Sequence, residues 1–173
     1  DEVLAAVAAA VGAGRAVAED LRWEQRDRYH LTLQFLGPLA RLAPVVDGLA
    51  AALRERAAFP YRLGGAGAFP NARRARVVWI GAASGGDALV GLAGAVSAAL
   101  KPLGYEAERG PLRPHLTVAR RRVPGDVGPV LAALGPEPVG PVFTVGDVVL
   151  YESRPSSQGP TYSVLERFPL GNA

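Results

Sequence analysis

The sequence contains no cysteine, no methionine and only two histidines among its 173 residues. Without cysteine, the chain can form no disulfide, no thiolate metal site and no cysteine nucleophile. A structural zinc site would have to recruit carboxylates in addition to both histidines, which makes such a site a poor prediction. We therefore expect the protein to hold no metal and no cofactor.

Long apolar runs are also missing from the chain. No uninterrupted stretch approaches the roughly 20 apolar residues that span a bilayer, and the N-terminus lacks the basic-then-apolar pattern of a signal peptide. With 49% hydrophobic residues, a chain of this length can still bury a substantial core. These features predict a soluble, cytoplasmic monomer without a membrane partner, in which residues 1–173 form a single domain.

Lysine is almost absent, because 18 of the 19 Lys and Arg residues are arginine. The planar guanidinium binds phosphate bidentately, so clusters of arginine favour anion binding. The three clusters are Arg22, Arg26 and Arg28; Arg73, Arg74 and Arg76; and Arg120, Arg121 and Arg122. Two of them lie close to a histidine in the sequence. The alternative for any one cluster is a solvated charged surface.

Hydrophobic spacing and the positions of glycine and proline predict an alternation of helices and strands. Helices are expected over residues 1–14, 42–56, 87–101 and 126–134. Strands are expected over residues 29–37, 59–68, 76–81, 115–121, 142–153 and 161–170. This mixed order, with hairpins, predicts an α+β fold of mainly antiparallel sheet and not a doubly wound parallel sheet.

One short motif, His-Leu-Thr followed by an apolar residue, occurs at both histidines, His30 and His115. The chain has four threonines, and two of them, Thr32 and Thr117, stand two residues after a histidine. In a chain of ordinary composition, the chance that both histidines are followed by Leu-Thr is roughly one in ten thousand or lower. A repeated motif indicates either a duplicated structural unit or two half-sites that present the same groups to one ligand. The spacing of 85 residues predicts one motif in each of two pseudo-symmetric lobes.

Each motif is expected to lie in a strand, where side chains alternate between faces. The imidazole and the hydroxyl would then share one face, and the two aliphatic residues would enter a core. Two imidazoles that ionise near neutral pH can act as a general acid and a general base, and the hydroxyls can donate to phosphate oxygens. The pair predicts metal-independent hydrolysis of a cyclic phosphodiester. The alternative for a single histidine is a packed or surface residue.

The paired His-x-Thr-x tetrapeptides resemble those of the 2H phosphoesterase family, and their surroundings resemble its RNA 2′,3′-cyclic phosphodiesterase (2′-5′ RNA ligase-like) branch. The similar segments, in the order of the family, are HLTLQFLG, GGAGAFPNARRARVVWIG, RPHLTVAR, VVLYES and YSVLERFPL. The resemblance implies two lobes of antiparallel sheet with outer helices and an active site in the cleft between them. It also implies a substrate, RNA with a 2′,3′-cyclic phosphate end or a related nucleotide, and a 2′-phosphate product.

The resemblance assigns roles to the four motif residues. His115 corresponds to the base that activates water and His30 to the acid that protonates the departing 3′-oxygen, while Thr32 and Thr117 bind phosphate. The chain departs from the family at Gln34, where a basic residue is common. It also begins within the first helical segment, whereas the family usually opens with a strand.

Four further residues are candidates for binding the substrate. Arg113 shares the face of His115, whereas Arg120 points to the other face if the strand is regular; both are predicted to bind phosphate. Phe35 and Trp79 could stack a base, with core packing as the alternative. The competing functions are 2′-5′ ligation of RNA ends, hydrolysis of a small cyclic nucleotide, and noncatalytic binding of RNA ends.

Overall fold

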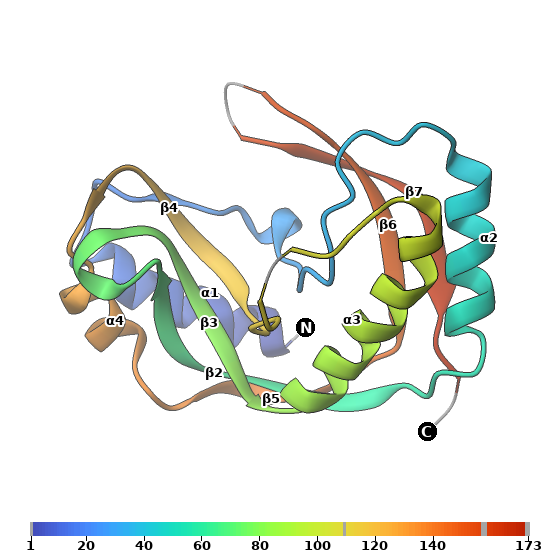
Figure 1. Ribbon diagram of the computed structural model, residues 1–173. Helices are drawn as coiled ribbons and strands as arrows, with labels where there is room; N and C mark the ends of the chain where they lie inside the picture. Colours follow the sequence, from blue (N-terminus) through green and yellow to red (C-terminus); the bar gives the residue numbers. More distant parts are fainter. Residues whose placement is uncertain (1, 109, 157–158, 172–173) are drawn as a thin grey trace. The chain divides into compact units, whose positions relative to one another are not determined.

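The computed structural model describes residues 2–108, 110–156 and 159–171, and its fold is α+β, as the sequence predicts. The chain divides into two compact units, each built from three separate segments. The first unit comprises Asp1–Thr32, Pro60–Gly86 and Arg113–Phe143. The second comprises Leu33–Phe59, Asp87–Leu112 and Thr144–Ala173. Figure 1 shows the elements of both units.

The first unit is built on a five-stranded sheet with the strand order β1-β4-β3-β2-β5. The strands are β1 (Arg22–Trp23), β2 (Phe59–Phe69), β3 (Ala75–Ser84), β4 (Leu116–Gly125) and β5 (Pro138–Val145). β3 pairs antiparallel with both β2 and β4. The predicted hairpin of β2 and β3 is confirmed. Its turn contains a 3-10 helix, Ala72–Arg74, and Asn71 Oδ1 accepts hydrogen bonds from the backbone N–H groups of Arg73 and Arg74.

Two helices belong to the first unit, α1 (Glu2–Arg15) and α4 (Gly128–Leu134), and they pack against each other. Helix α1 crosses the sheet from one edge strand to the other (Figure 1). Near its end, Gly14 lies against the ring of Trp23 in β1, and near its start Ala6 lies against Gly140 in β5. Glycine is needed at position 14 because a Cβ there would meet the indole.

The core of the first unit follows the strand alternation. On the side covered by α1, the central strands bury Val78, Ile80, Leu116 and Ala119, each at most 5% exposed. At roughly 1.5–3 kcal/mol for each fully buried large aliphatic side chain, this layer stabilises the sheet.

The second unit contains two helices, α2 (Leu42–Leu53) and α3 (Gly86–Leu100), and a hairpin of β6 (Asp147–Arg154) and β7 (Thr161–Pro169). A 3-10 helix, Lys101–Leu103, extends α3. Helix α2 packs on β7 and buries Val45, Leu49 and Leu53, which recur every fourth residue. The two helices and a closing pair of strands were predicted, the helices because their apolar residues recur at helical spacing.

The helical stretch Gly86–Leu103 is long and apolar enough, by length and composition, to cross a membrane, with a mean hydropathy of 1.2. The sequence analysis did not expect such a stretch. The buried side chains of α3 recur at helical spacing: Leu89, Leu92, Ala93, Val96 and Leu100. A stripe of this kind is the pattern of a helix that packs its apolar face on its own protein.

Two predicted strands differ from the structure. Residues 29–37 form no regular strand. Their only β-type pairing in the described structure is the isolated bridge of Leu31 with Leu116. Residues 142–153 belong to two strands of different sheets, because β5 ends at Val145 and β6 starts after Gly146. Two short elements, β1 and the 3-10 helix Arg26–Arg28, were not predicted.

Candidate active site

A single antiparallel bridge, between Leu31 and Leu116, joins the two histidine motifs within the first unit. In the register of this bridge, each histidine lies opposite the threonine of the other motif. Side chains directly opposite each other in an antiparallel pair share a face, and their neighbours lie on the reverse face. The two leucines therefore share one face, and the other face carries the polar set, His30, Thr32, His115 and Thr117. We call this the histidine face.

The expectation of one motif in each lobe is wrong for these four side chains, because all four belong to the first unit. The chain crosses to the second unit only at Leu33, after the bridge at Leu31 has been made. The first motif is thus divided between the units, and its polar residues stay with the sheet that holds the second motif.

Both imidazoles are held by the same backbone contact. Nδ1 of His30 lies 2.7 Å from the carbonyl oxygen of Arg28, and Nδ1 of His115 lies 2.7 Å from the carbonyl oxygen of Arg113. A carbonyl oxygen only accepts hydrogen bonds, so Nδ1 carries the proton and donates in both rings. Nε2 is then the atom of each ring through which a proton is taken or given.

Aromatic side chains support the second imidazole. The ring of Phe69 meets the ring of His115 edge-on at 5.0 Å, and the indole of Trp79 lies 6.0 Å from it, between ring centroids. Phe69 and Trp79 also pack on each other at 5.2 Å. Gly67, the partner of Trp79 across β2 and β3, leaves room for the indole, because a Cβ at that position would overlap it.

A register shift in β4 changes the expected direction of one arginine. Consecutive residues of β3, Val78 and Trp79, pair with Ala119 and Thr117, so β4 has one extra residue between these two pairs. An extra residue of this kind reverses the alternation beyond it. Arg120 therefore returns to the face of Thr117, because the regular strand that would turn it to the other face is interrupted.

Arg120 is fixed on the histidine face by a buried carboxylate. Its Nε donates to Oε1 of Glu24 at 2.8 Å. Glu24 is only 8% exposed and is the one charged residue in the described part of the chain that is buried to this degree. The side chain of Arg120 is 40% exposed, so the guanidinium is anchored on one side and reaches solvent on the other. Sequence analysis did not identify Glu24.

Comparison with known proteins identifies the family. Residues 5–156 match the model described as the 2′-5′ RNA ligase superfamily. The chain belongs to this superfamily. The match agrees with the resemblance seen in the paired motifs.

Relatives of this superfamily member include proteins named RNA 2′,3′-cyclic phosphodiesterase. The protein of Aeropyrum pernix is 34% identical over 145 residues, which cover 80% of this chain and 80% of the relative. The protein of Thermus thermophilus is 37% identical over 150 residues, covering 82% of this chain and 71% of the relative. The protein of Geobacillus stearothermophilus is 34% identical over 86% of this chain, which spans about half of that relative, 47%.

Solved structures with a similar fold include two crystal structures. The crystal structure of TT0787 of Thermus thermophilus matches with a TM-score of 0.82 and 29% identity, covering 99% of this chain and 93% of that one. The crystal structure of E. coli LigT complexed with 3′-AMP matches with a TM-score of 0.72 and 25% identity, covering 96% and 92%.

The resemblance implies a basic residue at the position of Gln34, and the structure gives the glutamine side chain a packing role. Gln34 Nε2 donates to the carbonyl oxygen of Tyr105 at 3.3 Å, and its Oε1 accepts from Ser97 Oγ at 2.7 Å. An amide can both donate and accept, which an arginine or lysine cannot do. Gln34 thus ties the segment after the first motif to α3 and its following loop, within the second unit.

The remaining candidates are placed as follows. Phe35 lies in the second unit and is 64% exposed, so it is not a core residue. Trp79 packs beside His115, and stacking on a base stays a prediction for both aromatic residues. Arg113 supplies the carbonyl that holds His115, and its exposed guanidinium stays a prediction as a phosphate ligand. Among the described residues, no group of three or more acidic or histidine side chains could hold a metal.

Proposed function

We propose that this superfamily member hydrolyses 2′,3′-cyclic phosphate ends of RNA to 2′-phosphate ends. The names of the relatives from Aeropyrum pernix and Thermus thermophilus support this substrate. The observation that carries the proposal is the register of the bridge between Leu31 and Leu116, because it gives two histidines and two threonines a common face.

The proposed reaction uses one histidine as base and the other as acid. Nε2 of neutral His115 takes a proton from water as the water oxygen attacks phosphorus. The bond between phosphorus and the 3′-oxygen breaks, and Nε2–H of protonated His30 gives its proton to that oxygen. The product is a 2′-phosphate with a free 3′-hydroxyl. Exchange of protons with solvent then returns both rings to their starting states.

The backbone contacts prepare both rings for this reaction. Because the backbone carbonyl oxygens of Arg28 and Arg113 accept hydrogen bonds from Nδ1, each neutral ring is held in the tautomer that leaves Nε2 free to take a proton. An orienting acceptor of this kind fixes the direction of the imidazole. The arrangement is the same in both motifs, as expected for residues that exchange acid and base roles in the reverse reaction.

Thr32 and Thr117 are the proposed donors to the non-bridging phosphate oxygens. Each hydroxyl lies opposite a histidine in the register of the bridge, so a phosphate between the rings meets a hydroxyl at either side. Arg120, held by Glu24, adds a positive charge on the same face. Negative charge that grows on the phosphate in the transition state is stabilised by these groups.

The test is an assay of the purified protein with an oligonucleotide that ends in a 2′,3′-cyclic phosphate, in the presence of a chelator. We expect turnover and a product with its phosphate on the 2′-oxygen. A 3′-phosphate product would contradict the assigned leaving group. Loss of activity in chelator, restored only by a divalent ion, would contradict the metal-independent mechanism.

A second candidate function is hydrolysis of a small cyclic nucleotide. The similar E. coli protein has been crystallised with 3′-AMP, NADP+ and ATP, which shows that a related fold accepts small nucleotide ligands. A third is 2′-5′ joining of RNA ends, which the description of the superfamily names and the same residues could catalyse in reverse. Incubating the protein with a cyclic mononucleotide, or with a cyclic end and a 5′-hydroxyl end together, distinguishes these from the main proposal.

A further inference from the structure

Two arginines lie directly opposite each other on the histidine face of the first unit. Arg22 of β1 pairs with Arg120 of β4, and the next pair along the two strands is Trp23 with Ala119. Trp23 lies against α1 and Ala119 is completely buried, so this second pair belongs to the core face. Arg22 and Arg120 therefore share the opposite face, which is the face of Thr117.

This pairing is unfavourable unless something offsets it. Like charges directly opposite in an antiparallel pair destabilise a sheet. Glu24 offers one carboxylate, and Arg120 occupies it through Nε. Arg22 is exposed, and within the described part of the chain its guanidinium makes no hydrogen bond or ion pair. Among the three side chains of Arg22, Arg120 and Glu24, one positive charge is in excess, and it resides on Arg22.

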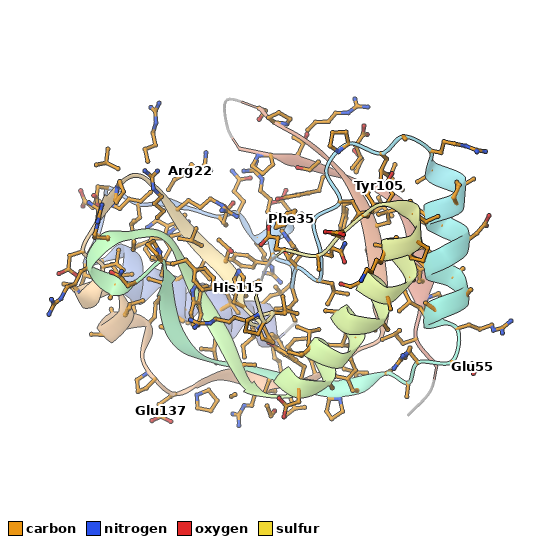
Figure 2. All side chains as sticks on the ribbon, in the orientation of Figure 1. Arg22, Phe35, Glu55, Tyr105, His115 and Glu137 are labelled. Carbon is orange, nitrogen blue, oxygen red and sulfur yellow. The ribbon has the colours of Figure 1, made fainter. Side chains whose placement is uncertain are left out.

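Arg22 also lies at a useful distance from the proposed reaction centre. Thr117 and Arg120 pair with Trp79 and Val77, which are two residues apart in β3, so Arg120 lies about 7 Å along the sheet from Thr117, and Arg22 lies about 5 Å further across the sheet. Figure 2 shows Arg22 and His115 toward opposite ends of β4. An extended strand of RNA that has its cyclic end at the histidines would pass its preceding phosphates over this region.

We propose that Arg22 binds a phosphodiester phosphate within the first two linkages upstream of the cyclic phosphate. The proposal rests on the proposed function and makes it narrower, because the substrate is then an RNA chain and not a mononucleotide. Phosphate contacts of this kind give affinity without reading the base sequence. The buried Glu24 keeps Arg120 in place beside Thr117 and leaves the upstream phosphate to Arg22.

The experiment compares two substrates that share the same reacting group. One is a cyclic mononucleotide, and the other is a trinucleotide that ends in the same 2′,3′-cyclic phosphate. We expect Arg22→Ala to lower the ratio of kcat/KM for the trinucleotide to kcat/KM for the mononucleotide by about tenfold, mainly through KM. Arg22→Lys keeps the charge and should recover part of the ratio.

The matched control removes an arginine elsewhere. Arg54→Ala deletes the same charge from the end of α2, where the side chain is 78% exposed. This variant should leave the ratio of the two substrates as it is in the unaltered protein. Equal changes of the ratio in Arg22→Ala and Arg54→Ala would mean that net charge, and not a site at Arg22, governs the preference.

A second substrate isolates the upstream phosphates from the upstream bases. In a trinucleotide with methylphosphonate linkages, the two upstream phosphates are uncharged while the bases and the cyclic end are kept. The unaltered protein should treat it as Arg22→Ala treats the normal trinucleotide, and Arg22→Ala should add no further loss. A full additional loss in the variant would overturn the proposal.

A binding measurement separates this proposal from the proposed function. Calorimetric titration with normal and methylphosphonate trinucleotides that end in a 2′-phosphate requires no turnover. Weaker binding of only the normal trinucleotide to Arg22→Ala supports the phosphate site. Equal affinity of the variant and the unaltered protein for the normal trinucleotide would overturn it. If the unaltered protein hydrolyses neither cyclic substrate, the proposed function fails while the affinities still decide the role of Arg22.

Discussion

The two faces of the five-stranded sheet differ in what their side chains do. On one face, Val78, Ile80 and Leu116 are at most 5% exposed and lie under α1. On the other face, β4 carries His115 just before its first residue, then Thr117 and Arg120. Strand alternation thus places an apolar layer and a polar layer within one short stretch of chain.

Because of this difference, one strand can contribute to the stability of the sheet through one face and to the proposed reaction through the other. Side chains that hold the sheet together point into the core, and the side chains proposed for catalysis point away from it. A change on the core face should therefore lower the free energy of unfolding and leave turnover intact. A change on the histidine face should lower turnover and leave the free energy of unfolding nearly unchanged.

The largest effect is expected for the histidines. His30→Ala and His115→Ala should each lower kcat/KM for a cyclic phosphate substrate by about 10²–10⁴, the usual contribution of a general acid or base. Thermal unfolding should change little, because neither imidazole lies in the apolar layer. The double variant should be little worse than either single variant, since an acid and a base that act in one step are not additive.

Turnover near the unaltered rate in either variant would remove that histidine from the mechanism. A variant that unfolds at a much lower temperature would show that the two faces are not independent. The proposed roles of the pair also predict a bell-shaped dependence of kcat/KM on pH, because one ring must be neutral and the other protonated.

On the core face, Ile80→Ala should lower the free energy of unfolding by about 2–4 kcal/mol through lost burial and the cavity that remains. Ile80 is 1% exposed and pairs with Leu116 across β3 and β4. Urea unfolding measures the loss, and kcat/KM of the folded variant should stay within about threefold of the unaltered protein. A hundredfold loss of turnover would mean that the core layer also sets the geometry of the motifs.

The threonines should give a smaller effect on turnover. Thr32→Val and Thr117→Val remove a hydroxyl and keep the branched shape, so we expect kcat to fall by about 10- to 100-fold, below the upper range for one oxyanion donor. Steady-state kinetics with the cyclic substrate measures it. If only KM changed, the hydroxyls would bind the substrate and its transition state equally.

Local periods in the sequence predicted much of this structure. The helices α2 and α3 were predicted because apolar residues recur at helical spacing, which depends on the segment alone. The alternation around each histidine predicts that imidazole and hydroxyl share a face, and the bridge between Leu31 and Leu116 brings the two motifs side by side. The catalytic roles themselves stay a proposal.

Other features depend on partners that no local pattern reveals. The direction of Arg120 depends on one extra residue in β4 relative to β3, which is a property of the pairing. Residues 29–37 alternate like a strand but pair only at Leu31, since the segment then leaves the sheet for the second unit. Strand β1 has two residues, too few for a periodic signal, and it brought both Arg22 and the neighbouring Glu24 to the site.

The smallest effect at neutral pH is expected at Tyr61 of β2. This side chain is completely buried and packs on Phe143 with ring centroids 5.5 Å apart. Its hydroxyl has no hydrogen-bond partner among the described residues. Tyr61→Phe should therefore change the free energy of unfolding at pH 7 by less than about 1 kcal/mol, because no hydrogen bond is lost.

The same variant should differ clearly from the unaltered protein at high pH. Burial raises the pKa of Tyr61 from 10.0 to about 12. Above pH 10 the unfolded chain releases the phenolic proton while the folded protein keeps it, so the unfolded state binds fewer protons and stability falls as pH rises toward 12. The slope approaches about 1.4 kcal/mol per pH unit and is absent in Tyr61→Phe. Urea unfolding of both proteins between pH 7 and 11.5 measures the difference, and a difference that stays constant above pH 10 would contradict the burial of this hydroxyl.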